Sequence, residues 1–115
     1  MYSAEKALPR YNRLMQSAVS HEIIDAEIRK AVEFLSHWPG VRRIWLFGSA
    51  AKGRGLDWRS DLDFAVEGMA STEQYRAWSE LDAQMKIPVD LVLMETANSI
   101  LRDEIVRSGR VLYEA

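Results

Sequence analysis

The segment LFGSAAKGRGLDWRSDLDFAVEG, from Leu46 to Gly68, constrains this chain more than any other part of its sequence. Its two ends are apolar and aromatic, as strands are, and the loop between them is rich in glycine and basic residues. Two carboxylates, Asp61 and Asp63, follow the loop directly, and apolar residues flank Asp63. Because burying an unpaired carboxylate is costly, this placement indicates chemistry rather than packing.

The rest of the chain predicts helices and strands on either side of this segment. Apolar spacing, capping residues and glycine or proline stops place their ends. The order of the elements indicates an α/β fold, a small mixed sheet with helices packed on it. We expect helices over Pro9–Val19, Ser20–His37 and Asn98–Ser108, the last stopped by Gly109, a further helix from Ser71 to before Pro88, and strands over Val41–Phe47, Leu62–Val66 and Val89–Met94.

The helix that begins at Ser71 carries two signals of its own. The first four residues, Ser71-Thr72-Glu73-Gln74, have the form of a capping box, in which Ser71 bonds the amide of Gln74 and Gln74 reaches back. Large apolar side chains then recur at helical spacing and predict one face packed on the core. This face comprises Tyr75, Trp78, Leu81 and Met85.

Composition limits the classes of protein that this chain can be. The chain has 115 residues, of which 48% are hydrophobic, so we expect a single domain over residues 1–115. The net charge is −2, with 15 basic and 17 acidic residues spread along the chain, so polymeric nucleic acid is not an expected partner. The chain has no cysteine, no apolar run of membrane length and no signal-peptide core at its start, and we expect a cytoplasmic protein without a membrane partner.

Three aspartates are candidate metal ligands. Asp61 and Asp63 are two residues apart on an expected strand, so their carboxylates project from one face, roughly 7 Å apart along the backbone. Asp90 lies near the start of another expected strand. If the strands are neighbours, the three carboxylates converge and repel one another unless a cation or protons intervene. Ligands that are all oxygen favour Mg²⁺ or Mn²⁺ over zinc.

The turn at Gly48-Ser49 is a candidate phosphate site. It follows a strand directly, and small residues there let backbone amides and the Ser49 hydroxyl approach phosphate oxygens, more so if a helix begins at that point. Two divalent ions that bridge phosphate oxygens can stabilise an in-line displacement. Simpler explanations also exist: Gly48 and Gly53 as turn glycines, Asp61 as a cap, and Asp90 as a solvated strand end.

Taken in order, these residues resemble the minimal nucleotidyltransferases of the DNA polymerase β-like superfamily, whose mark is an apolar strand, Gly-Ser, a short loop and Asp-x-Asp on the next strand. The resemblance implies the palm-like nucleotidyltransferase fold, with Gly48 and Ser49 holding the triphosphate of ATP. Asp61 and Asp63 would bind metal, with two Mg²⁺ ions expected and Mn²⁺ as an alternative. Asp90 would complete the metal site and the catalytic set and help to activate the acceptor hydroxyl.

One departure from the family pattern lies in the loop. Many relatives have Ala-Arg-Gly where this chain has Ala51-Lys52-Gly53. Lys52 would then supply positive charge to the nucleotide as a point donor, without the bidentate fork of arginine. Lys52, Arg54 and Arg59 together could equally form a solvated loop. Trp58 could stack on a base or a partner, or simply pack within the loop.

The resemblance also implies a partner. Minimal members of this kind are commonly encoded beside a small helical HEPN protein, and some act as antitoxins that transfer AMP from ATP to a tyrosine of that protein. The resemblance therefore predicts a metal-dependent adenylyltransferase with a protein acceptor, as a homodimer or hetero-oligomer. Two alternatives stay open: a non-catalytic module that neutralises a partner by contact, and a transferase for a small molecule such as an aminoglycoside.

Overall fold

The computed structural model describes residues 20–53 and 60–115 of the chain. The predicted helix over Pro9–Val19 and the loop residues Arg54, Trp58 and Arg59 lie outside these ranges. The elements, in chain order, are helix α2 (His21–Ser36), strands β2 (Arg43–Phe47) and β3 (Leu62–Glu67), the 3₁₀ turn η1 (Ser71–Glu73), helix α3 (Gln74–Ala83), strand β4 (Val89–Leu93), helix α4 (Ser99–Ser108) and strand β5 (Arg110–Glu114).

The described strands form one four-stranded sheet in the order β4-β3-β2-β5. β2 pairs antiparallel with both β3 and β5, whereas β3 and β4 are parallel. The predicted α/β fold with a small mixed sheet is therefore confirmed. Helix α3 makes the crossover that parallel strands require, since it connects β3 to β4.

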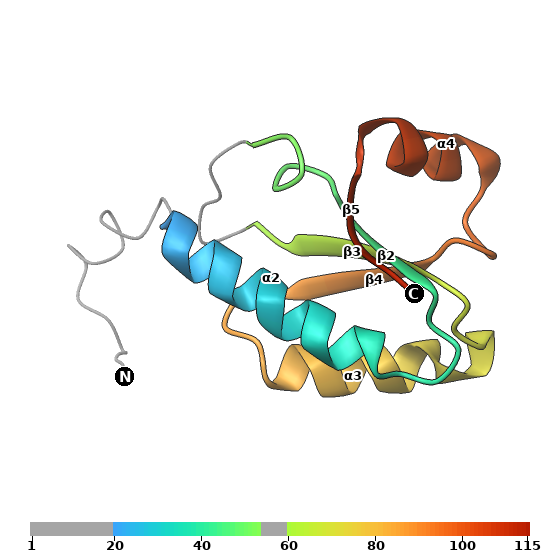
Figure 1. The fold of residues 1–115 in the computed structure, drawn as a ribbon, viewed down its shortest axis with the longest axis horizontal. Coiled ribbons are helices and arrows are strands. Elements are labelled where there is room, and N and C mark those ends of the chain that lie inside the picture. The colour runs from blue at the N-terminus through green and yellow to red at the C-terminus, as the bar shows by residue number, and fades with distance from the viewer. Residues whose placement is uncertain (1–19, 54–59) are drawn as a thin grey trace.

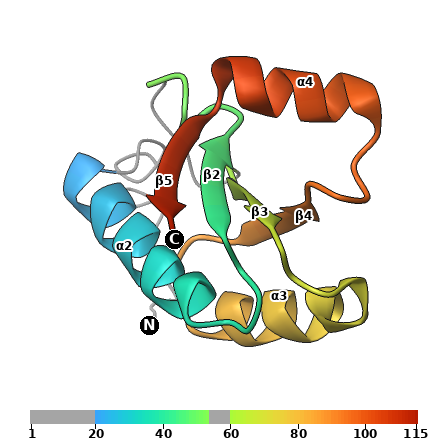
Figure 2. The same ribbon diagram turned by 45° about the vertical axis from the view of Figure 1, so that its right-hand side comes forward.

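The two faces of the sheet are covered by different helices (Figures 1 and 2). Alternate residues of the strands, such as Ile44, Phe64 and Leu91, point toward α2 and α3 and form the larger core. The opposite face carries a smaller apolar cluster under α4, built around Trp45 and Ile105. On that face the side chains at the ends of the strands are partly or fully exposed, among them Asp63, Glu67 and Asp90.

Local capping signals place the ends of two helices as expected. Ser20 is the N-cap of α2 and accepts a hydrogen bond from the Ile23 amide at 3.2 Å. Asn98 does the same for α4, accepting from the Leu101 amide at 2.9 Å. These caps need only neighbouring residues, and the predicted starts of the two helices fall at the observed cap residues.

The predicted start of α3 is wrong. The residues Ser71–Glu73 form a 3₁₀ turn, the amide of Gln74 donates to the backbone oxygen of Ser71, and neither cap position has a side-chain hydrogen bond. The Gln74 side chain does not reach back but donates to the Leu91 carbonyl oxygen at 2.9 Å. The predicted apolar face of α3 is also partly wrong. Its buried residues are Ala77 and Leu81, whereas Tyr75 is 76% exposed.

The C-terminal strand β5 was not predicted. The sequence places a helix stop at Gly109, and the helix does end there, but Gly109 has an extended backbone with φ −77° and ψ 166°. A side chain there would collide with the carbonyl oxygen of Ile105, because a Cβ would lie 2.4 Å from it. Gly109 thus leads straight into β5, which pairs with β2 at the edge of the sheet.

None of the helices within residues 20–53 and 60–115 has both the length and the apolar character that a membrane span requires.

Candidate active site

The pairing of β3 with β4 brings two of the three predicted acids together. In this parallel register Asp63 is the partner of Asp90, so the two side chains leave neighbouring strands on the same face of the sheet. Asp61 lies one residue before β3 rather than on the strand, and it is exposed. The sequence alone could state this juxtaposition only as a condition, because it depends on which strands are neighbours.

The three carboxylates interact through their charges. The pKa of Asp63 is raised from 3.8 to about 6, first because the carboxyl is partly removed from water, and then because Asp90 and Asp61 bring negative charge close to it. No cationic side chain among the described residues forms an ion pair with Asp63 to offset this repulsion. The acidic end of β3 and β4 therefore favours any cation that can reach it.

Gly48 is fitted against this acid. It directly follows β2 and has a backbone φ of +76°, a conformation that favours glycine. A Cβ at this position would lie 2.3 Å from the Asp63 carboxylate oxygen Oδ2. The glycine of the Gly-Ser pair thus has two roles, since it permits the turn and leaves room for the Asp63 carboxylate.

The loop after Gly48 consists of turns as far as Gly53. The Lys52 amide donates to the Ser49 carbonyl oxygen at 3.2 Å, and the Gly53 amide donates to that of Ala50 at 3.3 Å. In the described part of this loop no helix begins at Ser49, so the additional phosphate-binding effect of a helix N-terminus does not apply. Ser49 itself is exposed and directly follows Gly48.

Lys52, the predicted phosphate-binding cation, faces another element. Its ammonium group lies 3.9 Å from the Glu104 carboxylate of α4, and its side chain is 41% exposed. The pair is long and largely solvated, so it holds Lys52 only weakly. Reorientation of this flexible side chain toward a nucleotide would cost little.

The donor chemistry at the acidic end suits a hard divalent cation. The available ligands are carboxylate oxygens, which Mg²⁺ and Mn²⁺ prefer. A bound cation of this kind would remove the repulsion between the carboxylates. Within the described residues, no group of three or more acidic or histidine side chains is already arranged around one point as a metal cage. Mg²⁺ sites that also use substrate phosphates commonly need only one or two protein carboxylates.

A depression beside Asp90 was not anticipated from the sequence. It has a volume of about 390 Å³ and lies between the start of α3 and the outer edge of β4. Tyr75, expected in the core, instead lies at its wall, where its ring is 5.7 Å from that of Trp78. Tyr75 is two residues from the buried Ala77, so the two side chains lie on opposite sides of the helix. The lining residues are Ser71, Thr72, Gln74, Tyr75, Trp78, Asp90 and Leu91.

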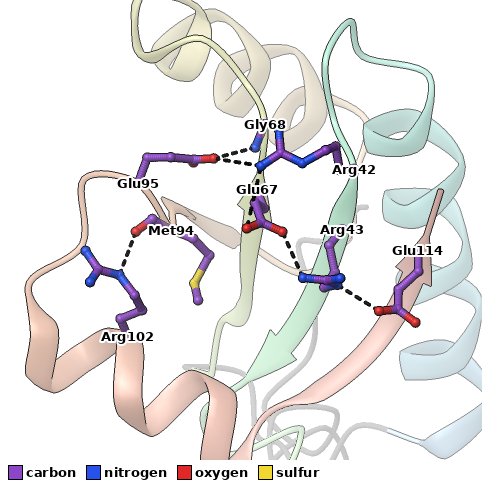
Figure 3. Close-up of polar contacts among 8 residues, drawn as sticks. All are labelled: Arg42, Arg43, Glu67, Gly68, Met94, Glu95, Arg102 and Glu114. Carbon is purple, nitrogen blue, oxygen red and sulfur yellow. Dashed lines mark hydrogen bonds and ion pairs between the residues drawn. The ribbon is translucent and has the colours of Figure 1, made fainter.

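The far end of the same sheet face is also charged, but there the charges are paired (Figure 3). Glu67 at the end of β3 lies 2.9 Å from Nη1 of Arg43 and 3.6 Å from Nη2 of Arg42. Glu114 of β5 binds Nε of Arg43 at 2.8 Å, and Glu95 accepts from the Gly68 amide at 2.8 Å. These contacts tie β2, β3 and β5 together.

Comparison with known proteins identifies the family. Residues 29–115 match the family described as Polymerase beta, Nucleotidyltransferase. The chain therefore belongs to this family and is a nucleotidyltransferase, which confirms the resemblance read from the Gly-Ser and Asp-x-Asp pattern. No curated protein sequence matches the chain.

Solved structures share the fold. A candidate minimal nucleotidyltransferase is 25% identical with a TM-score of 0.65, over 82% of this chain and 100% of that one. A toxin–antitoxin structure with AMP-PNP is 26% identical with a TM-score of 0.64, over 79% of this chain and 73% of that one. A complex of tri-AMPylated Shewanella oneidensis HEPN toxin with MNT antitoxin has 22% identity and a TM-score of 0.62, over 79% and 72% of the two chains.

Proposed function

We propose that this chain transfers AMP from ATP to a hydroxyl group of a small helical HEPN protein and acts as the antitoxin of that partner. The family supplies the reaction class, nucleotidyl transfer. Two similar structures support the finer proposal, since one is a toxin–antitoxin with AMP-PNP and the other holds an AMPylated HEPN toxin with its antitoxin. The observation that carries the proposal is the acidic end itself, where Asp63, Asp90 and Asp61 repel one another beside a Gly-Ser turn.

In this proposal the turn, the acids and the lysine have different tasks. Gly48 and Ser49 bind the triphosphate through backbone amides and the Ser49 hydroxyl. Asp61, Asp63 and Asp90 hold Mg²⁺, or Mn²⁺ in its place, and Lys52 adds positive charge near the phosphates. Mg²⁺, when bound, neutralises the carboxylates and withdraws charge from the phosphate oxygens.

The transfer step is a displacement at phosphorus. The acceptor oxygen forms a bond to the α-phosphorus of ATP, the bond from that phosphorus to the α,β-bridging oxygen breaks, and pyrophosphate leaves. Asp90, exposed at the edge of the sheet, accepts the proton of the acceptor hydroxyl. The products are the AMP ester of the acceptor and pyrophosphate.

The test is transfer to the protein encoded beside this chain. Wild type and Asp63→Asn are each incubated with that partner, ATP and Mg²⁺, and the intact mass of the partner is measured. We expect one or more AMP additions with wild type and none with Asp63→Asn, while both chains co-purify with the partner. If wild type co-purifies with the partner but adds nothing, the chain neutralises by contact and the transfer proposal is wrong.

A further inference from the structure

Asp63 and Asp90 occupy very different places in the sheet. Asp63 lies on β3, which has hydrogen-bonded neighbours on both sides, whereas Asp90 lies on β4 at the edge. An edge strand has a row of backbone N–H and C=O groups without a strand partner, so its position is less firmly fixed. The ladder with β3 sets the register of Asp90 against Asp63, and contacts on the outer edge hold β4 from its other side.

Side chains of α3 bind that outer edge. Gln74, Trp78 and Asp82 are spaced four residues apart, so they form one stripe along the helix. Trp78 Nε1 donates to the Val89 carbonyl oxygen at 2.8 Å, and Asp82 Oδ1 accepts from the Val89 amide at 3.1 Å. Gln74 Nε2 donates to the Leu91 carbonyl oxygen at 2.9 Å. The stripe thus bonds the residues on either side of Asp90.

A second carboxylate holds the chain just before β4. Glu27 of α2 is only 2% exposed, and its Oε1 accepts from the amides of Lys86 and Ile87, the latter at 2.9 Å. Burial raises the pKa of Glu27, but Lys30 at 2.9 Å and the two amides outweigh this effect and leave the pKa below its usual value. Glu27 is therefore held as a charged acceptor, which strengthens both backbone contacts.

The backbone just before β4 is also joined to the strand that carries Asp63. The Leu62 amide, between Asp61 and Asp63, donates to the Pro88 carbonyl oxygen at 2.9 Å. The backbone from Lys86 to Val89 is thus fixed on three sides, by α2, by α3 and by the start of β3. The next residue is Asp90.

We propose that Asp82 and Glu27 are positioning residues for nucleotidyl transfer, because they hold the backbone that sets Asp90 against Asp63. Neither residue touches substrate in this scheme, and the inference rests on the role proposed above for Asp90. Both residues lie outside the lining of the depression beside Asp90, and Asp82 is the better probe of the two since it is less buried than Glu27. Its loss removes one hydrogen bond from β4 without changing that lining.

The experiment compares Asp82→Ala with Asp82→Asn, which retains the Oδ1 acceptor. Transfer to the adjacently encoded partner is measured as kcat and as KM for ATP, with Glu80→Ala as the control on the same helix, where Glu80 contacts Arg76 at 3.6 Å. We expect Asp82→Ala to lower kcat about tenfold with little change in KM, and Asp82→Asn to restore most of it. Glu80→Ala should match wild type.

Amide hydrogen exchange of the free chain provides a readout that does not need activity. Asp82→Ala should accelerate exchange at Val89 at least tenfold, and Asp82→Asn should not. Unchanged exchange at Val89, or a kcat loss that Asp82→Asn fails to restore, would overturn the inference. A wild-type chain that transfers nothing contradicts the proposed function instead, and the exchange at Val89 still decides whether Asp82 holds β4.

Discussion

Two acids on one strand show how differently this protein treats negative charge. Asp63 and Glu67 lie on the same face of β3, near its two ends. Glu67 is paired with Arg42 and Arg43, in contacts that join β3 to β2. Asp63 faces Asp90 and Asp61, and its pKa rises to about 6. The first arrangement stabilises the sheet, whereas the second costs stability and makes sense as a binding site for a cation.

The two ends of β3 also contribute differently to function. The paired end needs nothing from outside, because its carboxylates already have guanidinium partners (Figure 3). The acidic end lies beside the Gly-Ser turn and at the depression next to Asp90. Changes at the acidic end should therefore affect nucleotide chemistry, and changes at the paired end should affect stability alone.

The largest expected effect comes from Gly48→Ala. The added methyl group collides with the Asp63 carboxylate and also occupies a backbone of φ +76°. We expect a loss of more than ~2 kcal/mol in unfolding free energy, measured by urea denaturation, and a loss of transfer. Gly53→Ala is the matched control, since Gly53 has φ +75° but open space around it. Equal effects of the two variants would contradict the contact between Gly48 and Asp63.

The next effect is on nucleotide affinity. Ser49→Ala removes one hydrogen bond to a charged phosphate, so ATP should bind about 10- to 100-fold more weakly in the presence of Mg²⁺, a loss of roughly 1.5 to 3 kcal/mol. Calorimetric titration with ATP measures this change. Ser79→Ala on the exposed side of α3 should bind ATP as wild type does. Unchanged affinity in Ser49→Ala would remove Ser49 from the site.

The repulsion at Asp63 predicts a pH dependence with a definite sign. Its pKa is higher in the folded chain, at about 6, than its ordinary value of 3.8, so the folded state binds the proton more tightly. Stability without metal should therefore fall as pH rises from about 4 to about 6 and stay low above that. Asp63→Asn lacks this loss and should be ~1 to 2 kcal/mol more stable than wild type at pH 8 in EDTA, after allowance for solvent screening.

That difference between Asp63→Asn and wild type should disappear well below pH 3.8, where the Asp63 carboxyl is protonated in both the folded and the unfolded chain. It should also shrink when Mg²⁺ is added, because the cation stabilises wild type alone. Thermal unfolding of both chains across this pH range is the measurement. A variant that is less stable than wild type at pH 8 in EDTA would show that Asp63 is stabilising, as Glu67 is.

The smallest effect is expected at the paired end. Glu67→Gln weakens two contacts with partly exposed arginines, so it should lower the unfolding free energy by only ~0.5 to 1 kcal/mol. Transfer at saturating ATP should stay within about twofold of wild type. The assay is the same intact-mass measurement. A large loss of transfer in Glu67→Gln would contradict the assignment of stability alone to the paired end.

The sequence predicts those parts of the fold that depend on neighbouring residues. The ends of α2 and α4 follow from Ser20 and Asn98, which cap their own helices. Strand β5 was not predicted because its partner β2 is far away in the chain. Its residues are also mostly exposed, so they show no apolar alternation. The start of α3 was wrong because Gln74 bonds distant Leu91 rather than its own helix end.

The same distinction applies to the site. The spacing of Asp61 and Asp63 and the preceding Gly-Ser are local signals, and they sufficed to indicate the family. The pairing of Asp63 with Asp90 needs the β3 to β4 register, which only the fold provides. Glu27 could not be recognised at all, because a glutamate on a helix looks like a surface residue until the Lys86 and Ile87 amides are placed against it.

The central claim is that the acidic end binds a divalent cation together with ATP. The most direct measurement is calorimetric titration of Mn²⁺ into wild type and Asp63→Asn, each saturated with a non-hydrolysable ATP analogue. We predict that wild type binds Mn²⁺ and that Asp63→Asn binds it at least ~10-fold more weakly, because the amide lacks the charge that attracts the ion. Equal Mn²⁺ affinity in the two chains would contradict the claim.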